Sequence, residues 1–433
     1  MYAAVLRTPY ALRTFGAALL GRLSYGTVSL SLMLAAKAAT GSYAVAGTVM
    51  ALFGAAGVFL SPLRARFIDR YGPRRALTPM ALGYAALLGV LAAVTWRPGV
   101  PGWLLVALAL CAGAAMPPLG PTMRTVWSQL LPDRRLLQRA YSLDGVAEEL
   151  LFVSGPLIVG VLVLFAPAAF GVALSAALVA AGTLVFVASP AVGAVAPTGR
   201  RGHREERAKV LGRVGRPVIV TLGVGIALGA ADLLVLAFAE DRGRADAAAW
   251  VLAALSAGSA VGGLANGAVD WRRPARSRLT LLSLGLAAAL GAAALAPGLL
   301  ALAGAAACVG LFVAPALTTA YLIADDAVDP GLRTQAGAWV NTAVNAGSSG
   351  GAAGVGLLVG RYPLPVCFAA AATAPLLAGL TTLTKTQAPQ NQAPPAIEER
   401  GPGQSPVTRA PSSGRPSKTP QSSSPSSPAS PAE

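Results

Sequence analysis

The sequence predicts an all-α membrane protein with twelve transmembrane helices, arranged as two pseudo-symmetric halves of six helices each. Three observations support this prediction: sparse charge, long apolar runs and an internal repeat. Of the 433 residues, 55% are hydrophobic and only 12% are charged, whereas soluble domains carry about 25% charged residues. Apolar runs of about 20 residues follow one another, and polar residues are confined to the short gaps between these runs.

Each apolar run is long enough to cross the roughly 30 Å of hydrocarbon in a bilayer. The spans are expected at residues 12–36, 42–63, 75–95, 102–123, 142–164, 167–190, 217–239, 247–268, 278–296, 298–323, 336–358 and 363–384. After residue 385 the composition turns to Pro, Ser and Gln, which is typical of disorder. The expected organisation is an N-terminal half at 1–192, a basic cytoplasmic linker at 193–216, a C-terminal half at 217–385 and a disordered cytoplasmic tail at 386–433.

The distribution of Lys and Arg predicts the orientation of these spans. With the N-terminus in the cytoplasm, the inner loops and the N-terminal segment carry 23 of the 34 basic residues, and the outer loops carry 5. Cytoplasmic loops of membrane proteins are enriched in this way, so we expect both termini to be cytoplasmic. The net charge of +16 comes from these gaps rather than from one helical face, which argues against nucleic-acid binding. The high content of Ala and Gly, and of Arg over Lys, suggests a GC-rich bacterial genome, and for a multi-pass protein we then expect the bacterial inner (cytoplasmic) membrane.

The two halves of the sequence match weakly at a fixed offset. A shift of 197 residues aligns Cys111 with Cys308 and Pro118 with Pro315, and a shift of 201 aligns Asp69 with Asp270. Six-span repeats of this kind are an architecture of secondary transporters, in which the substrate site lies between the halves.

The loop after the second span, "PLRARFIDRYGPRRAL", combines an acid, a turn glycine and several arginines. It resembles the signature loop of the major facilitator superfamily (MFS), Gly-x-x-x-Asp-Arg-x-Gly-Arg-Arg. The matching residues are Asp69, Arg70, Gly72, Arg74 and Arg75. Ala65 replaces the first glycine of that pattern, and Pro73 interrupts its basic end. The resemblance covers roughly residues 10 to 385, implies the MFS fold, and implies that this loop is a gating element rather than a substrate site.

A second segment, "SGPLIVG", is similar to a glycine–proline motif associated with antiporters of this superfamily. Gly155, Pro156 and Gly160 match the motif and are expected at a helix-packing contact, whereas Val159 replaces a glycine. Proton-coupled drug exporters of the superfamily often carry an arginine early in the fourth span. Ala109 stands at that position here, so this sequence departs from the familiar arrangement.

Charged and amide side chains inside the spans are the candidate substrate or proton-coupling residues, because a charge in hydrocarbon is unfavourable unless it faces a cavity or a partner. They are Arg22, Asp144, Glu148, Glu149, Asp232, Asn341 and Asn345. Asp144 and Glu148 are four residues apart and share one helical face. An acid removed from water binds a proton more readily, which would suit proton coupling. The alternative is an interhelical salt bridge between Arg22 and Glu148 or Glu149, with a purely structural role.

The expected function is secondary transport of a small molecule across the lipid bilayer by alternating access. The resemblance favours a proton-coupled exporter of drugs or metabolites that acts as a monomer. An importer or uniporter of a polar nutrient and a non-transporting membrane receptor or assembly protein are the alternatives. No HExxH pattern and no loop ending in GK[ST] occurs, so we expect no enzymatic activity, no catalytic residue, no metal site, and no cofactor other than a proton gradient as the energy source.

Overall fold

The computed structural model of the chain describes residues 2–196 and 210–383, and these residues form helices joined by short loops. Most of the expected basic linker and the whole expected tail, 386–433, lie outside the described residues. The last part of that linker is helical, because the seventh long helix begins at Val210 rather than near residue 217.

Twelve helical segments, two of them broken, match the twelve expected spans within the described residues. The N-terminal half contains α1 (Ala3–Leu6), α2 (Ala11–Thr40), α3 (Tyr43–Phe59), α4 (Ser61–Tyr71), α5 (Pro73–Thr95), α6 (Gly102–Ala115), α7 (Leu119–Leu130), α8 (Arg134–Leu162), α9 (Ala168–Ala188) and α10 (Pro190–Gly193). The C-terminal half contains α12 (Val210–Asp241), η1 (Ala245–Ala247), α13 (Ala248–Ala268), α14 (Ala275–Ala293), α15 (Leu299–Asp326), η2 (Pro330–Leu332), α16 (Arg333–Leu358) and α17 (Leu364–Thr381).

Length and composition alone identify nine of these segments as able to cross a membrane, or ten when the bent pair α3–α4 is counted as one span. The other two are α14 and α16. Their sequences explain why: α14 begins with Arg276 and Arg278, and α16 contains Asn341, Asn345 and many small residues. Both pack among the apolar helices of the C-terminal half, α14 against α15 and α17, and α16 against α12.

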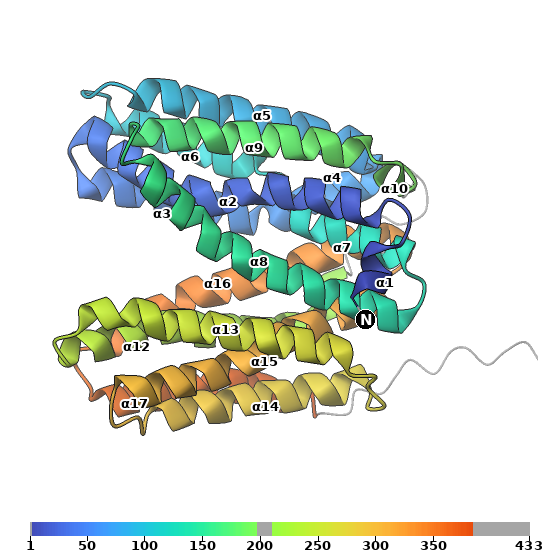
Figure 1. Ribbon diagram of the computed structural model, residues 1–433, viewed down its shortest axis with the longest axis vertical. Coiled ribbons are helices and arrows are strands. Elements are labelled where there is room, and N and C mark those ends of the chain that lie inside the picture. Colours follow the sequence, from blue (N-terminus) through green and yellow to red (C-terminus); the bar gives the residue numbers. More distant parts are fainter. Residues whose placement is uncertain (1, 197–209, 384–433) are drawn as a thin grey trace, which may run out of the picture. The chain divides into compact units, whose positions relative to one another are not determined.

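Each half of the chain packs as its own group of helices, and the two groups meet along α7, α8, α13, α15 and α16 (Figure 1). Helix α8 contacts α13 and α15, and α16 contacts α4 and α7. Figure 1 shows α8 and α16 on the facing sides of the two groups. The fifth span, α8, and the eleventh span, α16, therefore each contact helices of the other half.

The fourth span is broken where the tenth is continuous, and proline content explains the difference. Pro117 and Pro118 separate α6 from α7, whereas the repeat-related positions in α15 are Ala314 and Pro315. One proline removes a single backbone donor, but the residue before a proline is also pushed away from helical geometry. Two prolines in a row therefore stop the helix, and one does not.

The backbone carbonyls freed by this break are satisfied by side chains from neighbouring helices. Tyr25 of α2 donates a hydrogen bond to the carbonyl of Pro117. Arg64 of α4 donates to the carbonyls of Gly113 (2.6 Å) and Ala114 (3.2 Å) at the C-terminal end of α6. A cation at a helix C-terminus is also favoured by the helix dipole. The buried Arg64 thus supports the broken span.

Close helix packing in both halves depends on glycine. A Cβ at Gly182 of α9 would lie 2.2 Å from the backbone nitrogen of Gly21 in α2. In the C-terminal half, a Cβ at Gly225 of α12 would lie 2.1 Å from the carbonyl oxygen of Val344 in α16. Such contacts are shorter than any side chain tolerates, so small residues set these helix–helix distances.

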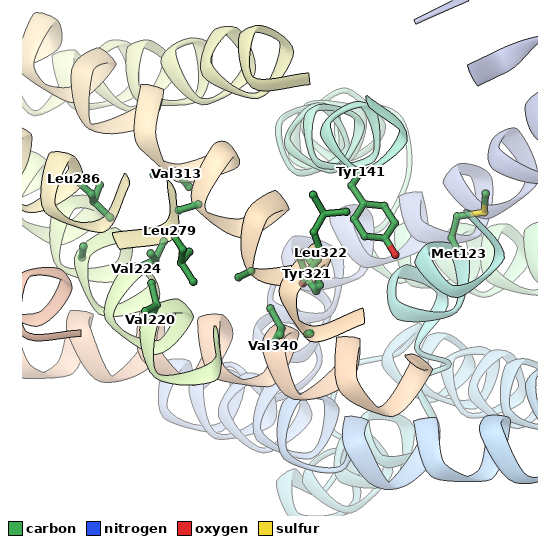
Figure 2. Close-up of a cluster of buried hydrophobic side chains, with 14 of the residues drawn as sticks. Met123, Tyr141, Val220, Val224, Leu279, Leu286, Val313, Tyr321, Leu322 and Val340 are labelled. Atoms are coloured by element: carbon green, nitrogen blue, oxygen red, sulfur yellow. The ribbon is translucent and has the colours of Figure 1, made fainter. Parts of the chain in front are cut away.

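The largest apolar core extends through the C-terminal half and continues into the N-terminal half. Figure 2 shows Val220 and Val224 of α12, Leu279 of α14 and Val313 of α15 within it. In the same view Tyr141 of α8 lies between Met123 of α7 and Leu322 of α15. This part of the core ends beside a group of buried charges.

Candidate functional site

Four charged side chains from three helices of the N-terminal half form one ion-pair network. Arg22 of α2 contacts Asp144 (Nη1 to Oδ1, 2.6 Å) and Glu148 (Nη2 to Oε2, 2.9 Å) of α8. Arg124 of α7 contacts the same two acids, Asp144 through Nε (3.0 Å) and Glu148 through Nη2 (2.7 Å). Two positive and two negative groups therefore alternate, and their formal charges cancel.

Burial differs sharply within this network. The side chains of Arg22, Arg124 and Asp144 are 2%, 6% and 0% exposed, whereas Glu148 is 28% exposed. Taking a charge out of water is unfavourable unless a partner compensates it. The network keeps three charges buried and presents the fourth, Glu148, to an open space.

The sequence suggested that Arg22 pairs with Glu148 or Glu149, and the structure shows one of these two pairs. Arg22 contacts Glu148, one of the two acids considered, and also Asp144. Glu149 lies outside the network and accepts a hydrogen bond from the hydroxyl of Ser259 on α13 (3.1 Å). Glu148 and Glu149 are adjacent on a helix, so their side chains point about 100° apart and meet different neighbours.

Arg124 was not among the candidates from the sequence. The expected fourth span ended at residue 123, which placed Arg124 in a basic loop. The helix restarts after the double proline and continues as α7 to Leu130. Pro117 and Pro118 were the available signal: a broken span needs more residues to cross the bilayer, so the helix had to extend past residue 123.

The network reaches the C-terminal half through an aromatic ring. The guanidinium carbon of Arg124 lies 3.8 Å from the ring centroid of Tyr321 on α15. The Tyr321 hydroxyl donates to the side-chain oxygen of Asn341 on α16 (3.4 Å), and Asn345 donates to the backbone carbonyl of Asn341 (2.7 Å). Tyr321 was also absent from the candidates, since aromatic residues are common in any core.

A cavity of about 400 Å³ lies between the halves beside these residues. Its polar lining comes from both halves: Arg124, Tyr141, Glu148, Glu149, Asp232, Ser256, Thr318, Tyr321, Asn341, Asn345 and Ser348. The structure thus brings five of the seven candidates to one cavity, while Arg22 and Asp144 lie behind it in the network.

In the part of the chain that the structure describes, two acids of this cavity lack a basic partner. Glu149 accepts a hydrogen bond from the neutral hydroxyl of Ser259. Within residues 2–196 and 210–383, no donor is within hydrogen-bonding or ion-pairing distance of Asp232 on α12. Because the network beside them is neutral, Glu149 and Asp232 make the cavity acidic. Across the same residues, no group of three or more His, Cys, Asp or Glu side chains is placed to hold a metal ion.

The loop between the second and third spans contacts the other half of the chain. Asp69 is buried at the end of α4, and its Oδ2 accepts a hydrogen bond from the backbone N–H of Gln335 (2.9 Å) near the start of α16. Gly72 turns the chain between α4 and α5 with a φ of 83°, which glycine adopts without strain.

The arginines of this loop have different positions. Arg74 donates to the carbonyls of Val187 (2.7 Å) and Ala188 (3.2 Å) at the end of α9, within its own half. Arg70 stacks on the ring of the neighbouring Tyr71, and Arg75 is exposed. Among the five candidate gating residues, Asp69 is the one seen in contact with the C-terminal half.

The repeat-related loop makes the reciprocal contact. Asp270, between α13 and α14, lies 3.4 Å from Arg135 and 3.5 Å from Arg139, both in the first turns of α8. Each half therefore places an aspartate from its own loop against the start of a helix of the other half. We call this end of the helices, with the loops around residues 72, 131–133, 269–274 and 327–332, the arginine-rich end.

The segment "SGPLIVG" contributes one packing residue. A Cβ at Gly155 would lie 2.4 Å from the backbone of Gly26, so α8 and α2 cross here in close contact. Pro156 is exposed, and Gly160 has open space where a side chain would be. The expected packing role is thus seen at Gly155 and not at Pro156 or Gly160.

Comparison with known protein families adds an independent observation. The model of the family described as Major Facilitator Superfamily matches residues 14–238 and again residues 218–425. The chain belongs to the Major Facilitator Superfamily. It is therefore a multi-pass membrane protein of a transporter family.

Solved structures of other transporters share this fold. A bacterial homologue of the iron transporter ferroportin, in an outward-facing state, has a TM-score of 0.69 and 15% sequence identity over 86% of this chain and 98% of its own. The human organic anion transporter MFSD10 has a TM-score of 0.65 and 14% identity over 88% and 99%.

The fucose:proton symporter FucP of E. coli has a TM-score of 0.63 and 14% identity over 88% of this chain and 100% of its own. At such identities these structures establish the fold and not a substrate. No curated protein sequence matches the chain significantly.

Proposed function

We propose that this superfamily member is a proton-coupled secondary transporter that exports small cationic or hydrophobic molecules by alternating access. The observation that carries the proposal is the cavity between the halves, in which Glu149 from the N-terminal half and Asp232 from the C-terminal half lack a basic partner among the described residues. Acids in this position can take either protons or a cationic group, and only one of the two at a time.

The ion-pair network beside Glu149 and Asp232 carries no net formal charge. Asp144 and Glu148 are held by Arg22 and Arg124, so a proton or a cation gains more by binding at Glu149 or Asp232 than at an acid that is already paired. Glu148 is the network member that faces the cavity. Because it contacts both Arg22 and Arg124, a change in its charge weakens or strengthens its attraction to both. We propose Glu149 and Asp232 as the exchange sites and Glu148 as the link to the network, with Asn341 and Asn345 as polar substrate contacts.

Alternating access requires contacts that open and close at each end. We propose that Asp69 and Asp270 hold the arginine-rich end closed, because each joins a loop of one half to a helix start of the other. The Arg content of that end supports its placement in the cytoplasm of a bacterium, with the N-terminus on the same side. The six-helix halves, 1–192 and 217–385, are the proposed moving bodies of a monomer.

Transport into everted membrane vesicles tests this proposal. Vesicles that contain the native chain are expected to accumulate a fluorescent organic cation such as ethidium when they are acidified inside. Glu149→Gln is expected to abolish this accumulation, and Glu148→Gln to reduce it. Asp241→Asn, an acid at the exposed end of α12, is the matched control and is expected to transport normally.

Two results would overturn the proposal. If Glu149→Gln and Asp232→Asn both transport at the native rate, the acids are not exchange sites. If transport by the native chain is unaffected by collapsing the pH gradient, protons do not drive it.

A further inference from the structure

A second cavity lies at the arginine-rich end, away from the acidic one. Its volume is about 320 Å³, and its walls come from the start of α8 in one half and from the α13–α14 loop, α14 and α15 in the other. Four arginines and two aspartates line it: Arg134, Arg135, Arg273, Arg278, Asp270 and Asp326. The formal charge of the lining is therefore +2, in contrast to the acidic cavity between the halves.

Arg278 is the buried member of this lining. Its side chain is held by neutral groups: the side-chain oxygens of Gln138 (3.0 Å) and Asn266 (2.9 Å) accept its hydrogen bonds, and the Trp271 ring lies 4.6 Å away. In the part of the chain that the structure describes, no carboxylate is within ion-pairing distance of Arg278. Its Nε is buried without a hydrogen-bond acceptor. A buried guanidinium without a counter-charge is unfavourable, and an anion in the cavity would supply that charge.

The start of α14 borders the same cavity. This 19-residue helix begins at Ala275, which lines the cavity, and it has neither a side-chain N-cap nor an acid in its first turn. The first N–H groups of a helix have no partner within the helix, and the helix dipole places positive charge there. Phosphate groups bind at helix starts for this reason.

The remaining arginines differ in how far they are neutralised. Arg134 pairs with Asp326, and Arg135 lies 3.4 Å from Asp270. Arg273 is exposed at the rim and, among the described residues, has neither an acidic partner nor a hydrogen-bond acceptor. Arg273 and Arg278 therefore account for the excess positive charge of the cavity.

From these observations we infer that this cavity is a binding site for a phosphate group, held by Arg278, Arg273 and the start of α14. A phosphate matches the planar donors of arginine and the backbone N–H groups of a helix start. The phosphate can come from an anionic lipid headgroup, since the cavity lies at an end of the membrane-spanning helices, or from a soluble phosphate. Arg134 and Arg135 of the other half line the same cavity, so a phosphate bound there lies at the boundary between the two halves.

Hydrogen exchange on the purified full-length protein in phosphatidylcholine nanodiscs tests this inference. Exchange is measured with inorganic phosphate against chloride at equal ionic strength, and again in nanodiscs that contain phosphatidylglycerol. Binding is expected to slow exchange in residues 134–139 and 269–278. Arg273→Gln is expected to raise the half-saturating concentration about tenfold, the usual effect of losing one charge-assisted hydrogen bond.

Arg272→Gln is the matched control, because this exposed neighbour carries the same charge but does not line the cavity. Protection by inorganic phosphate that Arg273→Gln weakens and Arg272→Gln does not supports a site for soluble phosphate. The same pattern with phosphatidylglycerol alone supports a headgroup site. Arg278→Gln, checked for folding by size exclusion, is expected to weaken binding further. Absence of protection with both ligands, or equal weakening in Arg272→Gln and Arg273→Gln, would overturn the inference.

Discussion

The guanidinium of Arg124 lies 3.8 Å from the centre of the Tyr321 ring, and this contact joins a charge network in one half of the transporter to a helix of the other half. Arg124 also holds Asp144 and Glu148. A shift of α15 relative to α7 therefore changes the surroundings of a buried cation. A movement between the two halves would therefore alter the ion-pair network.

The ring of Tyr321, more than its hydroxyl, is expected to matter for transport. Tyr321→Phe keeps the ring over Arg124 and loses the hydrogen bond to Asn341, whereas Tyr321→Leu removes the ring. A desolvated cation–π contact contributes about 2 kcal/mol, so Tyr321→Leu is expected to lower transport in everted vesicles by more than tenfold and Tyr321→Phe by a few-fold. Equal losses in the two variants would show that the ring has no special role.

The ion-pair network predicts a compensated double variant. Asp144→Ala leaves two buried arginines facing one acid, and breaking a buried pair in this way costs about 3–5 kcal/mol. Adding Arg22→Met restores neutrality, because Arg124 and Glu148 remain paired. Thermal unfolding of the purified proteins is expected to show a large loss in the single variant and partial recovery in the double one. A double variant less stable than Asp144→Ala would contradict this reading of the network.

Asp232 is expected to affect transport and not stability. It faces the cavity without a partner among the described residues, so Asp232→Asn breaks no contact seen in the structure. The free energy of unfolding is expected to change by less than about 0.5 kcal/mol, while cation transport into vesicles is lost. A clear drop in melting temperature would instead indicate that Asp232 has a structural role.

Asp69 is expected to control access at the arginine-rich end. Thr125 is buried there and lies 3.0 Å from the Thr334 hydroxyl of the other half. In a protein in which Cys111, Cys308 and Cys367 are replaced, Thr125→Cys reports access to a water-soluble maleimide.

Adding Asp69→Ala removes the acceptor of the Gln335 N–H and is expected to speed this labelling several-fold. The control is Arg70→Ala, which alters an exposed neighbour on the same loop. Labelling that is equally fast in both variants would argue against a specific role for Asp69.

The two glycines of "SGPLIVG" are expected to differ. Gly155→Val forces α8 away from Gly26, whereas Gly160→Val extends into open space. Overpacking typically costs about 1–3 kcal/mol, so Gly155→Val is expected to lower the melting temperature of the purified protein and Gly160→Val to leave it nearly unchanged. The reverse order would mean that this contact between α2 and α8 is not present in the membrane.

Much of the architecture followed from the sequence. The twelve spans were predicted because hydrocarbon admits helices of about 20 apolar residues and little else. The family resemblance rested on Asp69, Arg70, Gly72, Arg74 and Arg75, and the family match confirms it. The start of α12 and the end of α7 were missed, since both helices continue into charged sequence beyond their apolar part.

The sequence by itself determined which residues share a span and a helical face, such as Asp144 with Glu148 and Asn341 with Asn345. Only the tertiary structure decided which acids are neutralised. Arg22 and Asp144 are 122 positions apart, and Ser259 and Glu149 are 110 apart. Helical periodicity fixes the direction of a side chain around its own axis, but the partner that it meets depends on how separate helices pack. That packing placed Arg124 beside Asp144 and Glu148, and it left Glu149 and Asp232 facing the cavity.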